Sequence, residues 1–388
     1  MMITGIAALS LVIWLYLLLF RGGYWLSAVR DDTVSDAPLA KPHIVAVIPA
    51  RNEADNIADS LGSLLAQDYV GRFSIILVDD NSEDATAAIA ERLAREAPKV
   101  PLTVLRGTPL PEAWTGKLWA VKQGIAAASN HAPDFLLLTD ADIVYEPQVV
   151  SWLASHAVAG RYVLTSLMAK LRCETFAERA FIPAFIYFFE MLYPFRWVNN
   201  PHKKLAAAAG GCMLVKADAL ARAGGIEVIR DALIDDCTLG KVMKDQGPIW
   251  LGLTSRVHSI RPSVGIGDIH AMVSRSAYAQ LRYSPLLLAL TILGMALTYW
   301  VAPLAAIFGD GPVRWLGLGT WALMAVTFWP TLRFYGLSAL WGLVLPAIAT
   351  AYMAFTISSA LQHILGRGGR WKGRNQARMH NAGMKKVS

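Results

Sequence analysis

Two long apolar stretches enclose the polar middle of this chain, and they limit what it can fold into. Ile3 to Phe20 holds no charged residue and has the length that a helix needs to cross the hydrocarbon core of a bilayer, roughly 20 residues. The region from Leu286 to Leu365 is apolar again. Only 17% of all residues are charged, where an ordinary soluble protein has about 25%. We therefore expect a membrane protein with a polar domain between its membrane segments.

The N-terminal stretch is predicted to be an uncleaved transmembrane anchor over residues 1–22. A signal peptide has a basic residue before its apolar run and a small-residue cleavage site after it, whereas this run starts at Met1-Met2 and ends at Arg21. Residues 285–366 are predicted to hold the C-terminal transmembrane helices. Within them we expect spans at Leu286–Phe308 and Leu316–Leu332, and one tilted span or two short ones at Tyr335–Leu365.

Basic residues beside the membrane segments predict which side the polar domain faces. Arg21 and Arg30 closely follow the first span, and such residues tend to stay in the cytoplasm, so we expect the domain there. The basic tail, residues 367–388, favours the same side. Three C-terminal spans would put this tail outside, so the pattern requires either four spans or one apolar stretch that does not cross.

The net charge of +7 does not require a nucleic acid partner. Basic residues cluster beside the membrane segments, where anionic lipids attract them, so we expect the membrane and no nucleic acid as a partner. Cys173, Cys212 and Cys237 are widely spaced and form no metal or disulfide pattern, which is typical of a reducing compartment.

The central region, residues 41–284, alternates short apolar runs with helical patterns. Continuous apolar strands separated by helices are typical of a mainly parallel sheet with helices on both faces, so the predicted fold class is α/β. The four predicted strands are "HIVAVIP", "FSIILVDD", "LTVLRG" and "DFLLLTDAD".

Polar residues gather where three of these strands end. Arg51-Asn52-Glu53 follow the first strand, Asp79-Asp80 end the second, and Asp140 and Asp142 follow the fourth. Ligands of such sheets bind outside the carboxyl ends of the strands, where Asp80 could bond a base or ribose or simply cap a helix. Asp140 and Asp142 are two residues apart and could share one divalent cation, or bind one cation and a sugar hydroxyl. Such a cation would neutralise a diphosphate and let it depart. The first turn, "PARNEA", lacks the glycines of a dinucleotide-binding loop and disfavours a dehydrogenase.

Six motifs in a fixed order give the central region a family resemblance. They are "VIPARNEADNI", "VDDNSEDAT", "GKLWAVKQG", "LLLTDADIVYEP", "GGCMLV" and "IDDCTLGKVMKDQG". In this order, and followed by membrane spans, these motifs resemble family 2 glycosyltransferases of the GT-A fold, over roughly residues 41–284. The later "MVSRSAYAQLRYS" and "WKGR" are similar to the hopene-associated glycosyltransferases of hopanoid-producing bacteria.

The resemblance implies roles for particular residues. Pro49 and Glu53 would border the nucleoside of the donor and Asp80 would bond its base. Asp140 and Asp142 would form the D-x-D motif that holds a divalent metal, Mg or Mn, and the diphosphate. Asp235-Asp236 stand where the family has Glu-Asp, with Asp236 as the general base and Asp235 supporting it. Both acids lie near a predicted helix start, whose dipole stabilises an anion, so we expect Asp236 to be ionised at neutral pH.

Three further residues have a functional and a structural interpretation. Lys117 could contact the donor or be a surface lysine at a helix start. Gly211, after Gly210, could let the backbone approach a sugar or form a turn into a strand. Arg282 could contact the diphosphate or be a juxtamembrane arginine whose head reaches the interface; here Arg282-Tyr283 replace the Arg-Trp of the family motif.

The aromatic run at residues 176–197 is too interrupted by charged residues and Pro183 to span a membrane. Its rings suit the membrane interface, where the run could guide a lipid acceptor to the site; a helix packed on the domain is the alternative.

The function expected from these residues is transfer of a sugar from a nucleotide diphosphate sugar, most simply a UDP-sugar, to a lipid acceptor. The resemblance implies a multi-pass protein of the bacterial inner membrane and a hopanoid as one acceptor, with polyprenyl phosphate and ceramide-like lipids as alternatives. A haloacid-dehalogenase-like phosphatase also uses a D-x-D after a strand, but there the motif follows the first strand and not the fourth. A non-catalytic membrane scaffold would leave the converging acids without a role.

Overall fold

The computed structural model describes residues 2–32, 40–96, 99–263, 265–366, 370–371 and 374–375. The chain divides into two compact units, each built from separate stretches. The sheet unit comprises Val29–Arg172, Trp197–Pro262 and Arg370–Ser388, and the helical unit comprises Met1–Ala28, Cys173–Arg196 and Ser263–Gly369.

An eight-stranded mixed sheet forms the centre of the sheet unit, in the order β3-β2-β1-β4-β7-β6-β8-β5. The four predicted strands are confirmed as β1 to β4, and they pair in parallel. β7 pairs antiparallel with β4 and β6, and β5 pairs antiparallel with β8, so the sheet is less parallel than expected. The strands are β1 (Ile44–Ala50), β2 (Phe73–Asp79), β3 (Leu102–Arg106), β4 (Phe135–Thr139), β5 (Ile143–Tyr145), β6 (Leu164–Lys170), β7 (Cys212–Lys216) and β8 (Ile249–Ser259).

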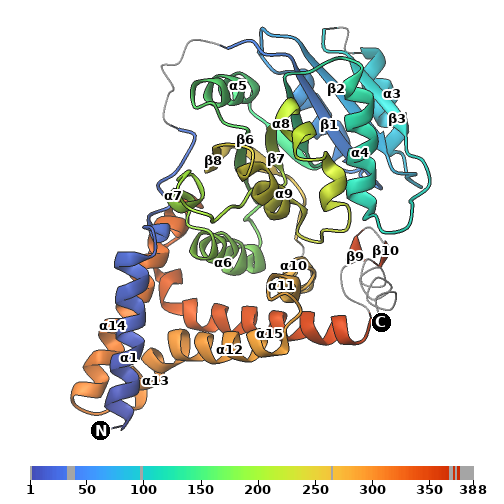
Figure 1. Ribbon diagram of the computed structural model, residues 1–388. Helices are drawn as coiled ribbons and strands as arrows, with labels where there is room; N and C mark the ends of the chain where they lie inside the picture. Colours follow the sequence, from blue (N-terminus) through green and yellow to red (C-terminus); the bar gives the residue numbers. More distant parts are fainter. Residues whose placement is uncertain are drawn as a thin grey trace. The chain divides into compact units, whose positions relative to one another are not determined.

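Helices cover both faces of the sheet (Figure 1). On one face, alternate side chains of β1, beginning with Ile44, share a core with α2, α3 and α5. On the other face α4 lies so close that a Cβ at Gly124 would come within 2.4 Å of Val47 Cγ1. The helices of this unit are α2 (Ile57–Leu65), α3 (Thr86–Glu96), α4 (Gly116–Ser129), α5 (Val149–Ala159), α8 (Ala217–Arg222), the 3-10 helix η2 (Ile226–Ile229) and α9 (Asp235–Lys244).

The helical unit packs around a core that includes Trp14, Tyr187 and Phe328, all fully buried. Three of the described helices are long and apolar enough to cross a membrane: Met2–Phe20, Pro285–Phe308 and Ala339–Ile364. The predicted span at Leu316–Leu332 is helical but is not one of these three. The elements are α1 (Met2–Phe20), the 3-10 helix η1 (Tyr24–Leu26), α6 (Phe176–Leu192), α10 (Ile266–Ser274), α11 (Ala277–Gln280), α12 (Pro285–Met295), the π-helix η3 (Ala296–Trp300), α13 (Val301–Phe308), α14 (Pro312–Phe334), the 3-10 helix η4 (Ala339–Val344) and α15 (Leu345–Ile364).

The aromatic run at 176–197 forms α6 and the start of the short helix α7 (Phe195–Val198). A capping box begins α6, because Thr175 Oγ1 accepts from the Glu178 backbone N–H while the Glu178 carboxylate accepts from that of Thr175. α6 packs in the helical core through side chains such as Tyr187, so this stretch, within the predicted 41–284 domain, groups with the apolar helices. The predicted basic tail, 367–388, lies outside the described residues except for β9 (Arg370–Trp371) and β10 (Arg374–Asn375).

Candidate active site

The carboxyl ends of the parallel strands β1, β2 and β4 lie at one edge of the sheet, as the sequence predicts. β7 runs antiparallel to β4, with Cys212 opposite Thr139, so the residues before β7 reach the same edge. β6 and β8 run parallel to each other and antiparallel to β7, so their carboxyl ends also point there. The sheet edge therefore collects side chains from more strands than the three that the sequence predicts.

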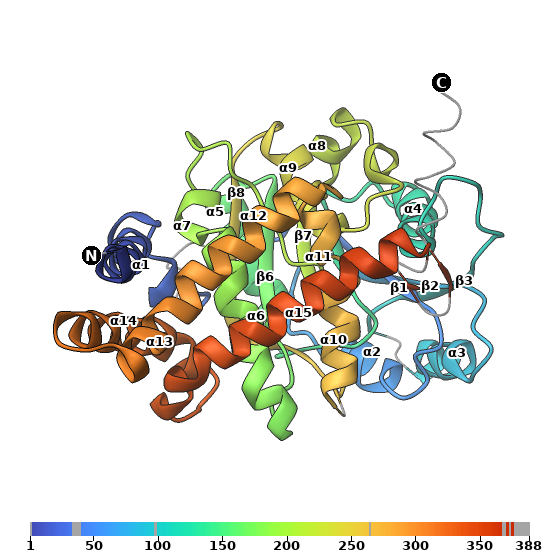
Figure 2. The same cartoon turned by 90° about the horizontal axis from the view of Figure 1, so that it is seen from below.

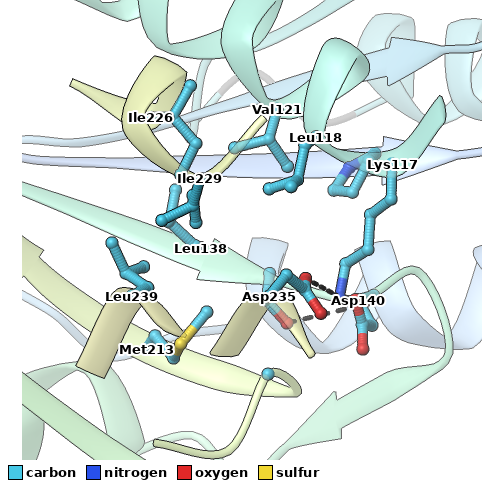
Figure 3. A pocket seen from close by; sticks show the side chains of 13 residues that line it. Lys117, Leu118, Val121, Leu138, Asp140, Met213, Ile226, Ile229, Asp235 and Leu239 are labelled. Carbon is cyan, nitrogen blue, oxygen red and sulfur yellow. Dashed lines mark hydrogen bonds and ion pairs between the residues drawn. The ribbon is translucent and has the colours of Figure 1, made fainter. Parts of the chain in front are cut away.

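The side chain of Lys117 joins two acids that come from different elements. Lys117 Nζ lies 2.8 Å from Asp140 Oδ1, at the end of β4, and 3.0 Å from Asp235 Oδ2, at the first residue of α9 (Figure 3). Lys117 itself is positioned by the start of α4, where Thr115 caps the helix by accepting from the Leu118 N–H. Of its two sequence interpretations, a surface lysine is wrong, because this ammonium lies between two carboxylates and only 20% of its side chain is exposed.

Burial and ion pairing act in opposite directions on this cluster. Burial by itself lowers the pKa of Lys117, but Asp140 and Asp235 outweigh it and hold the pKa well above its usual value. Burial raises the pKa of Asp140, and Lys117 opposes that rise. The Lys117 ammonium therefore opposes part of the effect that burial has on Asp140.

Asp236 lies beside this cluster at the second position of α9. Its carboxylate accepts hydrogen bonds from the backbone N–H of Gly210 at 3.0 Å and of Cys237 at 2.7 Å. Burial and then the Asp235 charge raise the pKa of Asp236 to about 6, although Lys117 and the two N–H groups act to lower it. The predicted position at a helix start is confirmed, but the helix start does not set the pKa, because burial and the adjacent acid outweigh it.

Asp142 has a different cationic partner from Asp140. Arg261 Nε lies 3.0 Å from Asp142 Oδ2, and an Arg261 terminal nitrogen lies 2.6 and 2.8 Å from the two oxygens of the buried Glu53. Ser259 Oγ also donates to Asp142 Oδ2, at 3.1 Å. Asp140 and Asp142 thus pair with separate cationic side chains. Among the described residues, no group of three or more His, Cys, Asp or Glu side chains is placed to hold a metal ion by itself.

Sequence reasoning missed Arg261. It follows β8 by two residues, and β8 was not among the predicted strands, so its place at the sheet edge could not be recognised. The rule that identified Glu53 and Asp142, a polar residue just after a strand, would have found it once β8 was known.

The first two strand ends form the side of the site that the resemblance assigns to the nucleoside. Asp80 is fully buried, and the Arg51 guanidinium donates to the Asp80 carbonyl oxygen at 2.6 Å. The Glu53 backbone N–H donates to Thr86 Oγ1 at 2.8 Å, which ties the first turn to the start of α3. Glu53, Asp80 and Pro49 therefore share one edge, as predicted.

The two glycines before β7 differ in their surroundings. Gly210 lines a pocket beside the Lys117 cluster, and a Cβ added to this glycine would lie 3.4 Å from Lys117 Nζ. Gly211 packs inward, where a Cβ would lie 3.1 Å from Ile143 Cδ1, and its carbonyl oxygen accepts from Thr139 Oγ1 at 2.8 Å. Gly210 therefore faces the pocket more directly than Gly211, and a close approach of the backbone to a sugar stays a prediction.

Arg282 belongs to the helical unit, whereas the cluster above is built from the sheet unit. It is exposed, and its backbone is left-handed at φ 52°, in a turn where its N–H donates to the Ala279 carbonyl oxygen. A contact with the diphosphate stays a prediction.

A pocket opens beside the Lys117 cluster, with a polar end and an apolar wall (Figure 3). Lys117, Asp140 and Asp235 form the polar end. The apolar side chains come from α4, β4, β7, η2 and α9, and they are Leu118, Val121, Leu138, Met213, Ile226, Ile229 and Leu239. Pro49, at the end of β1, also lines this pocket.

Comparison with known families agrees with this geometry. Residues 45–224 match the model of the family described as Glycosyl transferase family 2. The match covers less than half of the chain, so these residues are similar to that family. All the predicted donor and metal residues from Pro49 to Gly211 lie inside it, whereas Asp235, Asp236 and Arg261 follow it in the chain.

Curated relatives match part of the chain. An N-acetylglucosaminyltransferase of Rhizobium leguminosarum bv. viciae is 31% identical over 159 residues, 39% of this chain and 35% of that protein. Another, of Mesorhizobium japonicum, is 31% identical over 165 residues, 40% of this chain and 36% of that protein. The match thus spans about a third of the length of these relatives.

A solved structure with a similar fold is the mannosyltransferase PcManGT from Pyrobaculum calidifontis in complex with GDP-Man and Mn²⁺. The TM-score is 0.55 at 18% sequence identity, and the alignment covers 93% of this chain and 99% of that one. The similarity confirms the predicted GT-A fold.

Proposed function

We propose that the protein transfers a sugar from a nucleotide diphosphate sugar to a hydroxyl group of a membrane lipid. The observation that carries the proposal is the Lys117 bridge, because it joins Asp140, on the donor side, to Asp235, beside the proposed base. The family 2 match and the GT-A fold favour sugar transfer over a haloacid-dehalogenase-like phosphatase. Three helices apolar enough to cross a membrane favour a lipid acceptor.

The residues of the site divide the reaction between them. Pro49, Glu53 and Asp80 bind the nucleoside, and Lys117 offers positive charge where the diphosphate leaves. Asp236 accepts the proton of the acceptor hydroxyl, whose oxygen then attacks the anomeric carbon. The bond between that carbon and the diphosphate breaks, and direct displacement inverts the anomeric centre.

A divalent metal, Mg or Mn, fits the D-x-D acids if the donor supplies further ligands. Magnesium sites commonly use one or two carboxylates together with substrate phosphates and water. Asp140 and Asp142 offer two carboxylates, and the cationic side chain paired with each supports the proposal that positive charge is favoured at both positions. When bound, the metal would neutralise charge on the leaving diphosphate.

The donor is proposed to be a UDP-sugar and the acceptor a hopanoid, with polyprenyl phosphate or a ceramide-like lipid as alternatives. Curated relatives are named N-acetylglucosaminyltransferases and the solved relative holds GDP-Man, so UDP-GlcNAc, UDP-glucose and GDP-mannose should all be compared. Nucleotide sugars are made in the cytoplasm, which supports a site at the cytoplasmic face of the bacterial inner membrane.

The decisive experiment compares lipid extracts of cells with and without the protein. A glycosylated lipid that disappears with the protein, and that the purified enzyme makes from one of the three donors, would identify both substrates. Hydrolysis of a generic phosphate ester without any sugar transfer would contradict the proposal.

A further inference from the structure

The long helices of the helical unit run in two directions. α1, α13 and α14 lie side by side, whereas α12 and α15 lie crosswise to them (Figures 1 and 2). Figure 2 views α1 nearly end-on and shows α12 and α15 along their lengths. Helices that cross a bilayer tilt by up to roughly 40° from its normal. Only one of the two sets can therefore cross a given bilayer.

The ends of α14 indicate that its set is the one that crosses. Arg314 and Arg333 flank an uncharged stretch, Trp315–Leu332. At a rise of 1.5 Å per residue the two arginines are about 28 Å apart along the helix axis, close to the thickness of a hydrocarbon core. Trp315, beside Arg314, is 73% exposed, as expected for a ring at a membrane interface.

The C-terminal end of α1 lies beside the C-terminal end of α14. Ser27 Oγ, just after η1, is 3.1 Å from Thr331 Oγ1, in the last turns of α14. The two helices run in the same direction (Figure 1), so Arg21 and Arg333 mark one side and the loop at Asp310 marks the other. α1 carries no charged residue that would oppose its crossing.

α12 is too short to cross. The apolar stretch Pro285–Phe308 has the length of a span, but the π-helix η3 interrupts it, and π-turns are common sites of helix kinks. Trp14 Nε1 of α1 donates to the Thr298 carbonyl oxygen inside this turn, at 2.8 Å, and so holds the bend. The 11 residues of α12 extend only about 16 Å.

α15 is long enough to cross but carries a polar, protein-facing side. His270 Nε2 of α10 is 2.8 Å from Ser358 Oγ, and the Tyr278 N–H of α11 donates to Ser359 Oγ at 3.0 Å. Large apolar residues are nevertheless exposed along α12, in η4 and at the end of α15, including Leu286, Leu290, Leu293, Leu340, Leu361 and Ile364. Exposed leucines at this density need an apolar solvent.

We propose that α12 and α15 lie within one leaflet of the bilayer, with these apolar side chains against acyl chains, while α1 and α14 cross the bilayer. From within that leaflet, η3 and α13, which together extend about 20 Å, take the chain the remaining way to the Asp310 loop, and α14 returns it to the side of Arg21. Because α15 does not cross, the chain that follows Ile364 stays on the side of Arg21 and Arg333. The conflict between three C-terminal spans and a basic tail is then removed.

Side-specific labelling of the full-length chain in intact cells tests this path. Asp310→Cys should react with an impermeant maleimide from outside, and Ser338→Cys should react only after permeabilisation, with the wild-type chain as background for its three native cysteines. A fluorescent protein fused after Ser388 should fluoresce, because it folds in the cytoplasm. The proposal is overturned if Ser338 and the tail report opposite sides, or if Ser338 and Asp310 report the same side.

Depth measurements test the orientation of α12 separately. Spin labels at Leu286, Leu290 and Leu293, each in full-length protein in a phospholipid bilayer, should report one depth from their contact with oxygen and a water-soluble nickel complex. A helix along the bilayer normal would instead move the label by about 10 Å between the first and last position. A steady change of that size would overturn the in-plane assignment, and neither test depends on transfer activity.

Discussion

At the scale of single residues, the strongest prediction concerns Asp236. Its carboxylate is held by two backbone N–H groups beside the Lys117 cluster, which suits it to accept the proton of an acceptor hydroxyl. Asp236→Asn keeps the shape but removes the base, so we expect transfer to fall by about 10²–10⁴-fold. Nucleotide affinity, measured by calorimetry, should stay near that of the wild type.

Asp235→Asn is the matched control, because Asp235 pairs with Lys117 and is proposed only to support the base. Its loss of transfer should be smaller. If Asp236→Asn retained near-normal turnover with donor and lipid supplied, Asp235 would become the better candidate for the base.

The raised pKa of Asp236 makes the rate depend on pH. Burial and the Asp235 charge place this pKa at about 6. Only the ionised form accepts a proton, so the rate should rise with pH through about 6 and level off above 7. Initial rates in purified enzyme between pH 5 and 8 would show this, and a profile flat across that range would rule out Asp236 as the titrating base.

Asp142 is predicted to be needed for metal-dependent donor binding. Asp142→Ala removes one of two carboxylates proposed to share the metal and leaves Asp140 with Lys117. We expect the gain in UDP affinity on adding Mn²⁺ to be lost, as measured by calorimetry. Ser259→Ala, which removes only the neutral hydrogen bond to Asp142, is the control and should keep that gain. An unchanged metal effect in Asp142→Ala would contradict the assignment.

At the scale of elements, the position of α9 depends on Gly240. A Cβ there would lie 2.8 Å from the backbone carbon of Ala207, so the helix that carries both acids lies directly on that segment. Gly240→Ala must push α9 away, and overpacking of this kind costs about 1–3 kcal/mol. We expect a lower unfolding midpoint and reduced transfer.

Gly62→Ala in α2 is the control, since nothing lies within 4 Å of the added Cβ. Alanine in a helix interior is favoured over glycine by roughly 0.5–1 kcal/mol, so this variant should be neutral or more stable. Equal destabilisation by both changes would show that the contact at Ala207 does not position α9.

At the scale of the whole molecule, the sheet unit is not one continuous piece of chain. Cys173–Arg196 leave it to join the helical unit, where Tyr187 is fully buried in the core. A fragment of residues 41–262 would expose that surface of α6, together with Phe176, already 75% exposed. We expect the fragment to aggregate without detergent in size-exclusion chromatography. A monodisperse, detergent-free fragment would show that α6 can fold with the sheet alone.

The sequence by itself determined those helices and strands that short local patterns specify. The stretch "GKLWAVKQGIAAAS" is helical from Gly116 to Ser129 as predicted, because its helical pattern and the Thr115 cap lie within one short segment. The four apolar runs became β1 to β4, and their polar tips meet because parallel strands end at one edge. The acid pair was also correctly placed at a helix start.

Tertiary structure decided what depends on residues far apart in the chain. Asp140 pairs with Lys117 and Asp142 pairs with Arg261. The two acids lie close together in one motif, so their positions in the sequence could not reveal that they have different partners. The pKa of Asp236 follows burial, which exists only after packing and here outweighs the helix start. The apolar runs at 285–308 and 339–364 likewise have the composition of spans, but composition carries no direction. Their direction relative to α1 is set by the π-turn at Ala296–Trp300 and by side-chain packing, so only the folded chain shows it.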